Sequence, residues 1–182
     1  MRTSAILAVF LLLWPSGAVA DEALWQALRQ GSAVALIRHA EAPGTGDPAG
    51  FRLDDCATQR NLSEAGQNQA RRLGNAFRQH GIDQALVLTS AWCRARDTAA
   101  LLDLGQPEAA PALASLHGQS GRRDAQVAEL KALIRSLPPN RVLVLVSHQA
   151  TISALVNVHP ASGEVIVVDR RSLQALGRLP AP

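Results

Sequence analysis

The chain has very few lysines and aromatic side chains for its length. Lys131 is the only lysine among 18 basic residues, tyrosine is absent, and aromatic residues make up 3% of the 182 residues. Nucleic-acid binders gather Lys and Arg into a stripe with aromatic residues between them. The formal net charge is only +3 and the basic residues are spread along the chain, so we expect no nucleic-acid partner.

Long hydrophobic runs are missing beyond the first residues of the chain. The apolar run from Ala5 to Trp14 is too short to cross roughly 30 Å of hydrocarbon as an anchor. It follows Arg2 and precedes the small residues Ala18-Val19-Ala20, which is the pattern of a secretory signal peptide and its cleavage site. We therefore predict a signal peptide over residues 1–20, one mature domain over residues 21–182 with no membrane span, and export to the periplasm.

Cysteine is scarce, since Cys56 and Cys93 are the only two in the chain. Two buried free thiols are one reading of such a pair. In an oxidising compartment a pair of this kind forms a disulfide. The predicted export therefore favours a Cys56–Cys93 disulfide.

Apolar runs with the character of strands alternate with segments of helical periodicity. The predicted strands cover residues 32–37, 85–89, 141–146, 164–168 and 172–176. The predicted helices cover residues 64–80, with Ser63 as N-cap and Gly81 as stop, and 92–102, 126–136 and 151–156. This alternation is typical of an α/β fold, a three-layer α/β/α sandwich with a mostly parallel central sheet.

Cationic and imidazole side chains follow three of the predicted strands. Arg38 and His39 follow the first strand, Arg94 lies one helical turn beyond the second, and His148 follows the strand at 141–146. Ligands of such sheets bind beyond the carboxyl ends of the strands. Two arginines would grip phosphate oxygens there, while one imidazole attacks phosphorus and the other, if protonated, stabilises the equatorial oxygens.

Metal binding is the rival use of histidine. The five histidines lack the close pairs of zinc sites, and neighbouring arginines repel a cation. We expect no metal.

Four segments carry a family pattern in the same order along the chain. They are Leu36 to Glu41 (LIRHAE), Leu62 to Gln67 (LSEAGQ), Ser90 to Ala99 (SAWCRARDTA) and Val144 to His148 (VLVSH). The first resembles an Arg-His-Gly/Ala signature, the second a Leu-Ser/Thr-x-x-Gly helix start, and the third a Ser-Pro-x-x-Arg-x-x-Gln/Glu-Thr-Ala segment. The fourth resembles a late Val-x-His motif. Together they resemble the histidine phosphatase superfamily, the phosphoglycerate-mutase-like group.

The resemblance implies a phosphoglycerate-mutase-like fold with no metal or organic cofactor. It makes His39 the nucleophile of a phosphohistidine intermediate and gives Arg38, Arg94 and His148 the phosphate pocket. Arg60 would face the substrate. Ala91 departs from the family pattern because it stands where many members have proline.

The family's usual proton donor, an acid on a loop after the second arginine, has no clear counterpart. His117, Glu164 and Asp55 are the candidates. The chain is also similar to small exported members that act on lipopolysaccharide core heptose phosphate. It is therefore predicted to be an exported phosphomonoester phosphatase acting on small phosphorylated molecules such as phosphorylated envelope sugars. A non-catalytic phosphate-ligand binder and a phosphoglycerate-mutase-type phosphotransferase remain as alternatives.

Overall fold

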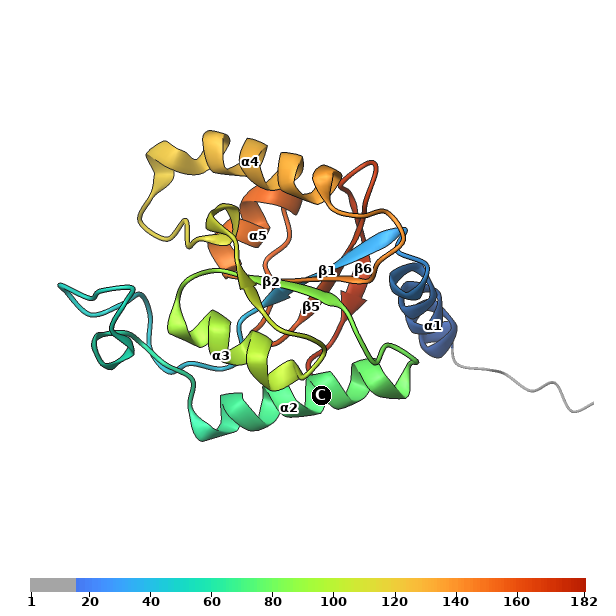
Figure 1. Ribbon diagram of the computed structural model, residues 1–182, viewed down its shortest axis with the longest axis horizontal. Coiled ribbons are helices and arrows are strands. Elements are labelled where there is room, and N and C mark those ends of the chain that lie inside the picture. Colours follow the sequence, from blue (N-terminus) through green and yellow to red (C-terminus); the bar gives the residue numbers. More distant parts are fainter. Residues whose placement is uncertain (1–15) are drawn as a thin grey trace, which may run out of the picture.

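A six-stranded sheet forms the centre of the molecule (Figure 1). The computed structural model describes the backbone of residues 16–182 and the side chains of residues 21–182. The strand order is β3-β2-β4-β1-β5-β6, and the strands are β1 (Ala33–Arg38), β2 (Leu86–Thr89), β3 (Glu108–Ala109), β4 (Leu143–Ser147), β5 (Val165–Asp169) and β6 (Ala175–Leu179). The strands from β3 to β1 pair in parallel, whereas β5 and β6 add antiparallel pairs, so the predicted mostly parallel sheet is confirmed.

Five helices cover the two faces of this sheet (Figure 1). They are α1 (Ser16–Arg29), α2 (Glu64–Gln79), α3 (Cys93–Leu102), α4 (Arg123–Ser136) and α5 (Gln149–Val156). Side chains of α1, α2 and α3 share one core cluster with the sheet, and those of α4 and α5 share the other. The chain is therefore a three-layer α/β/α sandwich, as the alternation of its segments predicts.

Continuous apolar runs made the central strands recognisable because both faces of the sheet are covered. In β4, Val144 and Val146 belong to the cluster on the α1–α3 side, whereas Leu143 and Leu145 belong to the one on the α4–α5 side. All four side chains are fully buried. A strand whose side chains pack alternately into two hydrophobic clusters has no polar face.

Helix α2 begins and ends where the sequence predicts. The Ser63 hydroxyl accepts a hydrogen bond from the Gly66 amide at 3.0 Å, and Gly81 follows the helix with a φ of 75° that favours glycine. At Gly66 an added Cβ would lie 2.0 Å from the Glu41 carbonyl oxygen. Glycine therefore lets α2 approach the segment that follows β1.

Three elements differ most from the sequence predictions, which contain neither helix α1 nor strand β3 and begin strand β6 too early. Helix α1 runs across the predicted cleavage position after residue 20, and residues 1–15 lie outside the described residues; the signal peptide stays a prediction. Strand β6 starts three residues later than predicted. The Asp169 carboxylate accepts hydrogen bonds from the amides of Arg171 and Ser172, which extends the turn before β6.

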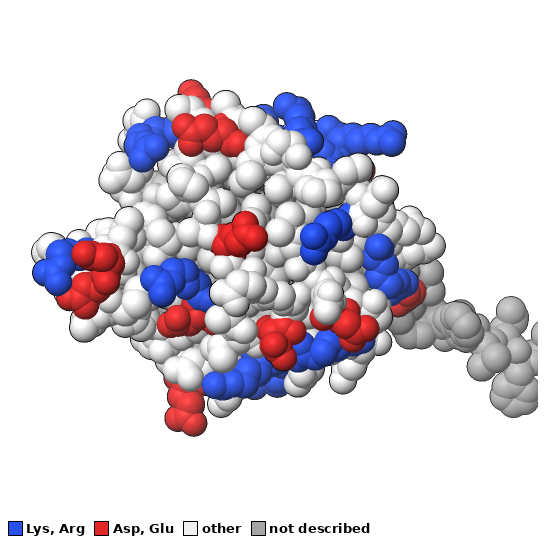
Figure 2. Space-filling model, in the orientation of Figure 1, with Lys and Arg blue, Asp and Glu red and all other residues white. Residues whose placement is uncertain are grey.

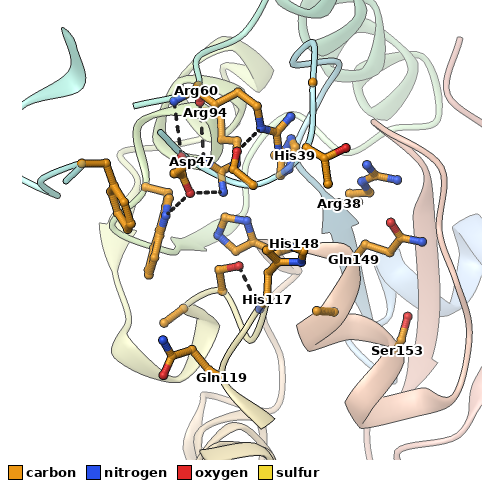
Figure 3. Close-up of a pocket in the computed structure, with 18 of the residues that line it drawn as sticks. Arg38, His39, Asp47, Arg60, Arg94, His117, Gln119, His148, Gln149 and Ser153 are labelled. Carbon is orange, nitrogen blue, oxygen red and sulfur yellow. Dashed lines mark hydrogen bonds and ion pairs between the residues drawn. The ribbon is translucent and has the colours of Figure 1, made fainter. Parts of the chain in front are cut away.

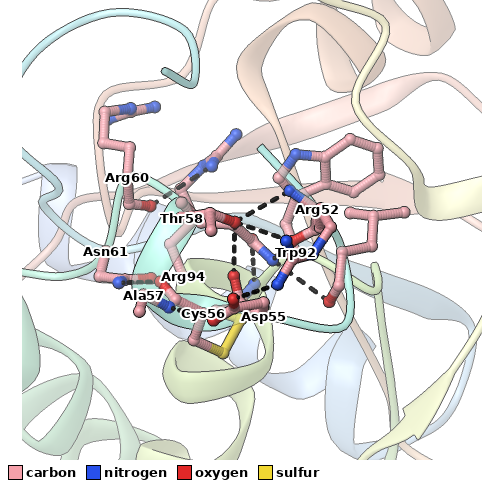
Figure 4. The surroundings of a disulfide bond; sticks show 12 residues. Arg52, Asp55, Cys56, Ala57, Thr58, Arg60, Asn61, Trp92 and Arg94 are labelled. Atoms are coloured by element: carbon pink, nitrogen blue, oxygen red, sulfur yellow. Dashed lines mark hydrogen bonds and ion pairs between the residues drawn. A yellow bond between two sulfur atoms is a disulfide. The ribbon is translucent and has the colours of Figure 1, made fainter. Parts of the chain in front are cut away.

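The predicted disulfide between Cys56 and Cys93 is present, with the two Cα atoms 5.7 Å apart (Figure 4). It joins the first residue of a short 3-10 helix (Cys56–Thr58) to the first residue of α3. The Gln59 side chain reinforces this junction, because its Oε1 accepts from the Cys93 amide at 3.0 Å. The long segment after β1 is thereby tied to the start of α3.

Acidic and basic side chains are interspersed on the face shown in Figure 2. That face has no extended stripe of one sign. From residue 16 onward, no helix is both long enough and apolar enough to cross a membrane.

Candidate functional site

A cavity of about 950 Å³ lies beyond the carboxyl ends of the parallel strands (Figure 3). Arg38 and His39 reach it from the end of β1, Arg94 from the first turn of α3, and His148 from the end of β4. The structure therefore brings together the four residues that the sequence assigned to one edge of the sheet. The His39 and His148 rings meet edge to face, with centroids 5.4 Å apart.

The His39 ring is held in one orientation and one tautomer. Its Nδ1 donates to the Ala40 carbonyl oxygen at 2.8 Å, so the lone pair is on Nε2. Burial, together with the charges of nearby arginines such as Arg94, lowers the pKa of His39 from 6.5 to about 3. At neutral pH this side chain is an uncharged imidazole with an available nucleophilic nitrogen.

His148 is also uncharged in the ligand-free protein. Burial, then the neighbouring His39 and the nearby arginines, hold its pKa well below its ordinary value. Its Nε2 shares a hydrogen bond of 2.7 Å with the Ser90 hydroxyl, while its Nδ1 is buried without a partner among the described residues. The protonated imidazole considered from the sequence therefore requires an anion nearby to offset the arginine charges.

Arg94 is buried and its terminal nitrogens are already occupied. Its NH1 and NH2 donate to the two carboxylate oxygens of Asp47, at 2.6 and 3.1 Å (Figure 3). The Trp92 indole N–H donates to the same carboxylate at 3.0 Å. The Nε atoms of Arg94 and Arg38 are buried with no partner in the described part of the chain, which is the kind of deficit that an additional oxyanion satisfies.

Arg60 lines the cavity, but its guanidinium is directed into the loop after β1. It donates to the carbonyl oxygens of Ala42 and Gly46, and its own amide donates to the Asp47 carboxylate at 3.3 Å. The sequence placed Arg60 against the substrate. In the structure its side chain holds the loop that carries Asp47.

The Thr98 hydroxyl links the segment after β1 to the first turn of α3. The Thr98 hydroxyl accepts from the Ala40 amide at 2.9 Å and donates to the Arg94 carbonyl oxygen at 2.7 Å. The residue after His39 is thereby fixed to the helix that carries Arg94.

The three proton-donor candidates lie in different places. His117 lines the cavity. Glu164 does not; it accepts from the Ala161 amide and pairs with Arg178 at 3.2 Å. Asp55 does not line it either, because it caps the 3-10 helix at Cys56 and pairs with Arg52.

Asp47 is the only carboxylate among the described residues that line the cavity, and sequence reasoning did not single it out. It lies 47 residues before Arg94 along the chain, and its neighbours Gly46 and Pro48 mark the segment only as a loop. The remaining lining is largely polar and uncharged or aromatic, and includes Phe51, Trp92, Ser115, Gln119, Gln149 and Ser153. Within residues 16–182, no group of three or more His, Cys, Asp or Glu side chains is placed to hold a metal ion.

Residues 34–118 match the model of the histidine phosphatase superfamily, branch 1. This segment includes the first three of the four motif segments identified in the sequence. A comparison with curated proteins finds no match.

Solved structures share the fold of the chain. A protein from Agrobacterium tumefaciens assigned as the phosphohistidine phosphatase SixA is 20% identical with a TM-score of 0.59, over 84% of this chain and 99% of that one. A protein histidine phosphatase SixA complexed with tungstate is 21% identical with a TM-score of 0.53, over 76% and 89%. Phosphoglycerate mutase from Thermus thermophilus is 19% identical with a TM-score of 0.55, over 82% and 99%. At these identities the likeness establishes the phosphoglycerate-mutase-like fold.

Proposed function

Because the chain belongs to the histidine phosphatase superfamily, we propose that it is an exported phosphomonoester phosphatase that works through a phosphohistidine on His39. The observation that carries this proposal is the His39 ring itself. Its Nδ1 is committed to the Ala40 carbonyl, and its unprotonated Nε2 belongs to a cavity lined by Arg38 and Arg94. A nucleophile beside two guanidinium groups suits the attack on a phosphate ester.

In the first step, His39 Nε2 attacks the phosphorus atom of the ester. The N–P bond forms while the P–O bond to the alcohol breaks, and the leaving oxygen takes the electron pair and a proton. Arg38 and Arg94 bind the phosphoryl oxygens, and His148 gains a proton as the anion offsets the surrounding positive charge. These groups stabilise charge where it develops in the transition state.

In the second step, water attacks the phosphohistidine. The new O–P bond forms, the N–P bond returns its electron pair to Nε2, and the water proton leaves to a base. Inorganic phosphate departs and His39 is again the neutral imidazole. The hydrogen bond from Nδ1 to the Ala40 carbonyl oxygen keeps the His39 ring in one orientation through both steps.

The size and lining of the cavity support a substrate larger than phosphate alone. Gln119, Gln149 and Ser153 offer amide and hydroxyl groups, and Trp92 and Phe51 offer aromatic surfaces whose ring centroids are 6.1 Å apart. Hydroxyl-rich sugars use both kinds of contact. Phosphorylated envelope sugars, and small phosphorylated molecules of that kind, are the substrates that we propose.

Export is supported by the Cys56–Cys93 disulfide, which fits an oxidising compartment, and by the signal-peptide pattern of residues 1–20. The periplasm is the location that we propose.

A phosphohistidine-protein phosphatase would be a second use of such a pocket, because one solved structure of this fold is named as the protein histidine phosphatase SixA.

Hydrolysis of para-nitrophenyl phosphate by residues 21–182, with EDTA present, tests the proposal. We expect activity in the wild type and in His80→Gln, a histidine outside the cavity, and none in His39→Ala. Quenching with alkaline detergent during turnover should trap a phosphoenzyme whose phosphate is later released by acid, as expected for phosphate on histidine. Equal activity in the wild type and His39→Ala would refute the assignment of His39.

A further inference from the structure

The Asp47 carboxylate occupies the terminal nitrogens of Arg94, which the proposed function assigns to the substrate phosphate. Its two oxygens accept from both terminal nitrogens of Arg94, at 2.6 and 3.1 Å, in the paired geometry that a guanidinium also offers to phosphate. The Trp92 indole N–H and the Arg60 amide complete four donors around the same carboxylate. The phosphate site of the ligand-free protein is therefore partly filled by the protein's own side chain.

A phosphate dianion and the Asp47 carboxylate cannot share Arg94 at low cost. Phosphate and the Asp47 carboxylate are both negatively charged and repel each other. The Arg94 and Asp47 side chains are only 3% and 9% exposed, so water would screen this repulsion poorly. The other charged and titratable groups that line the cavity are Arg38, His39, Arg60, His117, Arg122, His148 and His159. The substrate gains Arg94 most easily when Asp47 gives up its negative charge.

Resting on the proposed function, we propose that Asp47 exchanges Arg94 for a proton when the substrate phosphate binds, and that the resulting carboxylic acid is the proton donor to the leaving group. Asp47 is the only carboxylate that residues 21–182 contribute to the cavity lining. After Arg94 along the chain, no Asp or Glu lines the cavity.

The proton can be followed through the cycle. One proton from solvent is taken up by Asp47 as phosphate replaces it on Arg94. When His39 Nε2 attacks phosphorus, the breaking P–O bond leaves its electron pair on the alcohol oxygen, which receives the Asp47 proton. The Asp47 carboxylate then accepts the proton of the water that attacks the phosphohistidine. After it releases this proton to solvent, its negative charge returns to Arg94 and opposes the product phosphate, which promotes product release.

Sulfate binding tests the exchange without catalysis, because sulfate is a dianion that carries no proton near pH 7. Calorimetric titration in two buffers of different ionisation enthalpy measures protons taken up per sulfate bound. We expect the wild type and Asp54→Asn, a matched loop control outside the cavity, to take up about one proton more per sulfate than Asp47→Asn, which keeps the uptake at His148. Asp47→Asn should also bind sulfate about tenfold more tightly or better.

Turnover tests the donor role in the same variants. An alkyl phosphate has a poor leaving group, so in Asp47→Asn the rate at which it phosphorylates His39, measured by rapid quench in a single turnover, should fall about 10²- to 10⁴-fold. The rate of the same step with para-nitrophenyl phosphate, whose leaving group needs little protonation, should fall far less. Circular dichroism checks folding, and Asp47→Ser repeats each measurement with a smaller side chain.

Several outcomes would overturn the exchange. They are a wild type without proton uptake, an Asp47→Asn variant with unchanged uptake and affinity, and an equal loss of the phosphorylation rate on both substrates. The proposed function fails separately, when the wild type shows no His39-dependent hydrolysis of para-nitrophenyl phosphate. The sulfate measurements judge the exchange in either case.

Discussion

Asp47 and Arg94 form a buried, bidentate ion pair in the candidate site, with nitrogen–oxygen distances of 2.6 and 3.1 Å. The pair joins the loop after β1 to the first turn of α3, so it links two segments that each contribute to the site. It also compensates the Arg94 charge while no anion is bound. The geometry depends on the planar fork of a guanidinium.

Arg94→Lys should therefore damage the protein although it preserves the charge. A lysine ammonium cannot donate to both Asp47 oxygens in this geometry, and losing one hydrogen bond to a charged group costs about 1.5–3 kcal/mol. We expect the free energy of unfolding to fall by about that amount in urea titrations. Arg96→Lys, at an exposed position of α3, is the control, and an equal effect in both variants would argue against a special role of the fork.

The low pKa of His39 should make the folded protein less stable as the pH falls. Burial and the nearby arginines lower this pKa from 6.5 to about 3. Between these values the unfolded chain binds a proton that the folded chain does not, so the unfolding free energy rises with pH across this window. His39 contributes at most about 1.4 kcal/mol per pH unit to the slope of the unfolding free energy against pH.

Urea unfolding between pH 7 and pH 5 measures this slope. Replacing the titratable ring in His39→Gln should make the dependence shallower, by about 1 kcal/mol per pH unit at the acidic end. Parallel curves for wild type and His39→Gln would show that His39 is protonated equally in the folded and unfolded states.

Thr98 should act as a positioning residue for the site. Thr98→Val removes the hydroxyl that accepts from the Ala40 amide, and a buried amide without an acceptor costs about 1–3 kcal/mol. We expect a lower melting temperature and a lower kcat for para-nitrophenyl phosphate, because the Ala40 carbonyl that orients His39 shifts with its amide. Thr98→Ser keeps the hydroxyl and should restore both values; a serine variant as impaired as the valine variant would contradict this role.

The sequence was sufficient for the layers of the fold because the central strands are apolar at every position before their last residue. β4 supplies side chains to both core clusters, and that requirement is visible as an uninterrupted apolar run. Strand β3 has two exposed residues and leaves no such signal. The start of β6 depends on how the Asp169 side chain arranges the turn before it, which periodicity does not describe.

The residues of the candidate site also fall into a group that the sequence predicts and one that it does not. Arg38, His39 and His148 were predictable because they follow strands, and Arg94 because it lies one turn into a helix that follows a strand. Asp47 belongs to a loop whose path is set by tertiary contacts, chiefly the Arg60 guanidinium on the Ala42 and Gly46 carbonyls. Neither spacing nor composition brings Asp47 to Arg94.

Cleavage after residue 20 should leave a stable protein. Among the residues of α1 whose side chains the structure describes, Trp25 and Leu28 are buried in the core, and Glu22 pairs with Arg29 at 2.6 Å; all four remain after this cleavage. We expect the exported protein to begin at Asp21 by intact mass, and residues 21–182 to melt within a few degrees of the full chain. Replacing Ala18 and Ala20 with leucine should block processing, and an exported wild-type protein whose mass does not correspond to residues 21–182 would place the cleavage elsewhere.

Removing the Cys56–Cys93 bridge should lower stability far more than it lowers activity. The bridge closes a loop with a sequence separation of 37, which on the chain-entropy model is worth about 4 kcal/mol. The double variant Cys56→Ser, Cys93→Ser should lose about this much unfolding free energy in urea, measured against the oxidised wild type. Wild type unfolded with a reductant present is the control, and it should show a similar loss.

Activity should largely survive because other contacts still hold the loop. Gln59 accepts from the Cys93 amide, and Arg60 holds the carbonyls of Ala42 and Gly46. Below its lowered melting temperature, the double variant should therefore hydrolyse para-nitrophenyl phosphate at a rate within a few-fold of wild type. A double variant that is as stable as wild type would remove the case for the bridge as a stabiliser. One that is folded but inactive would mean that the bridge itself places Asp47 and Arg94 in the cavity.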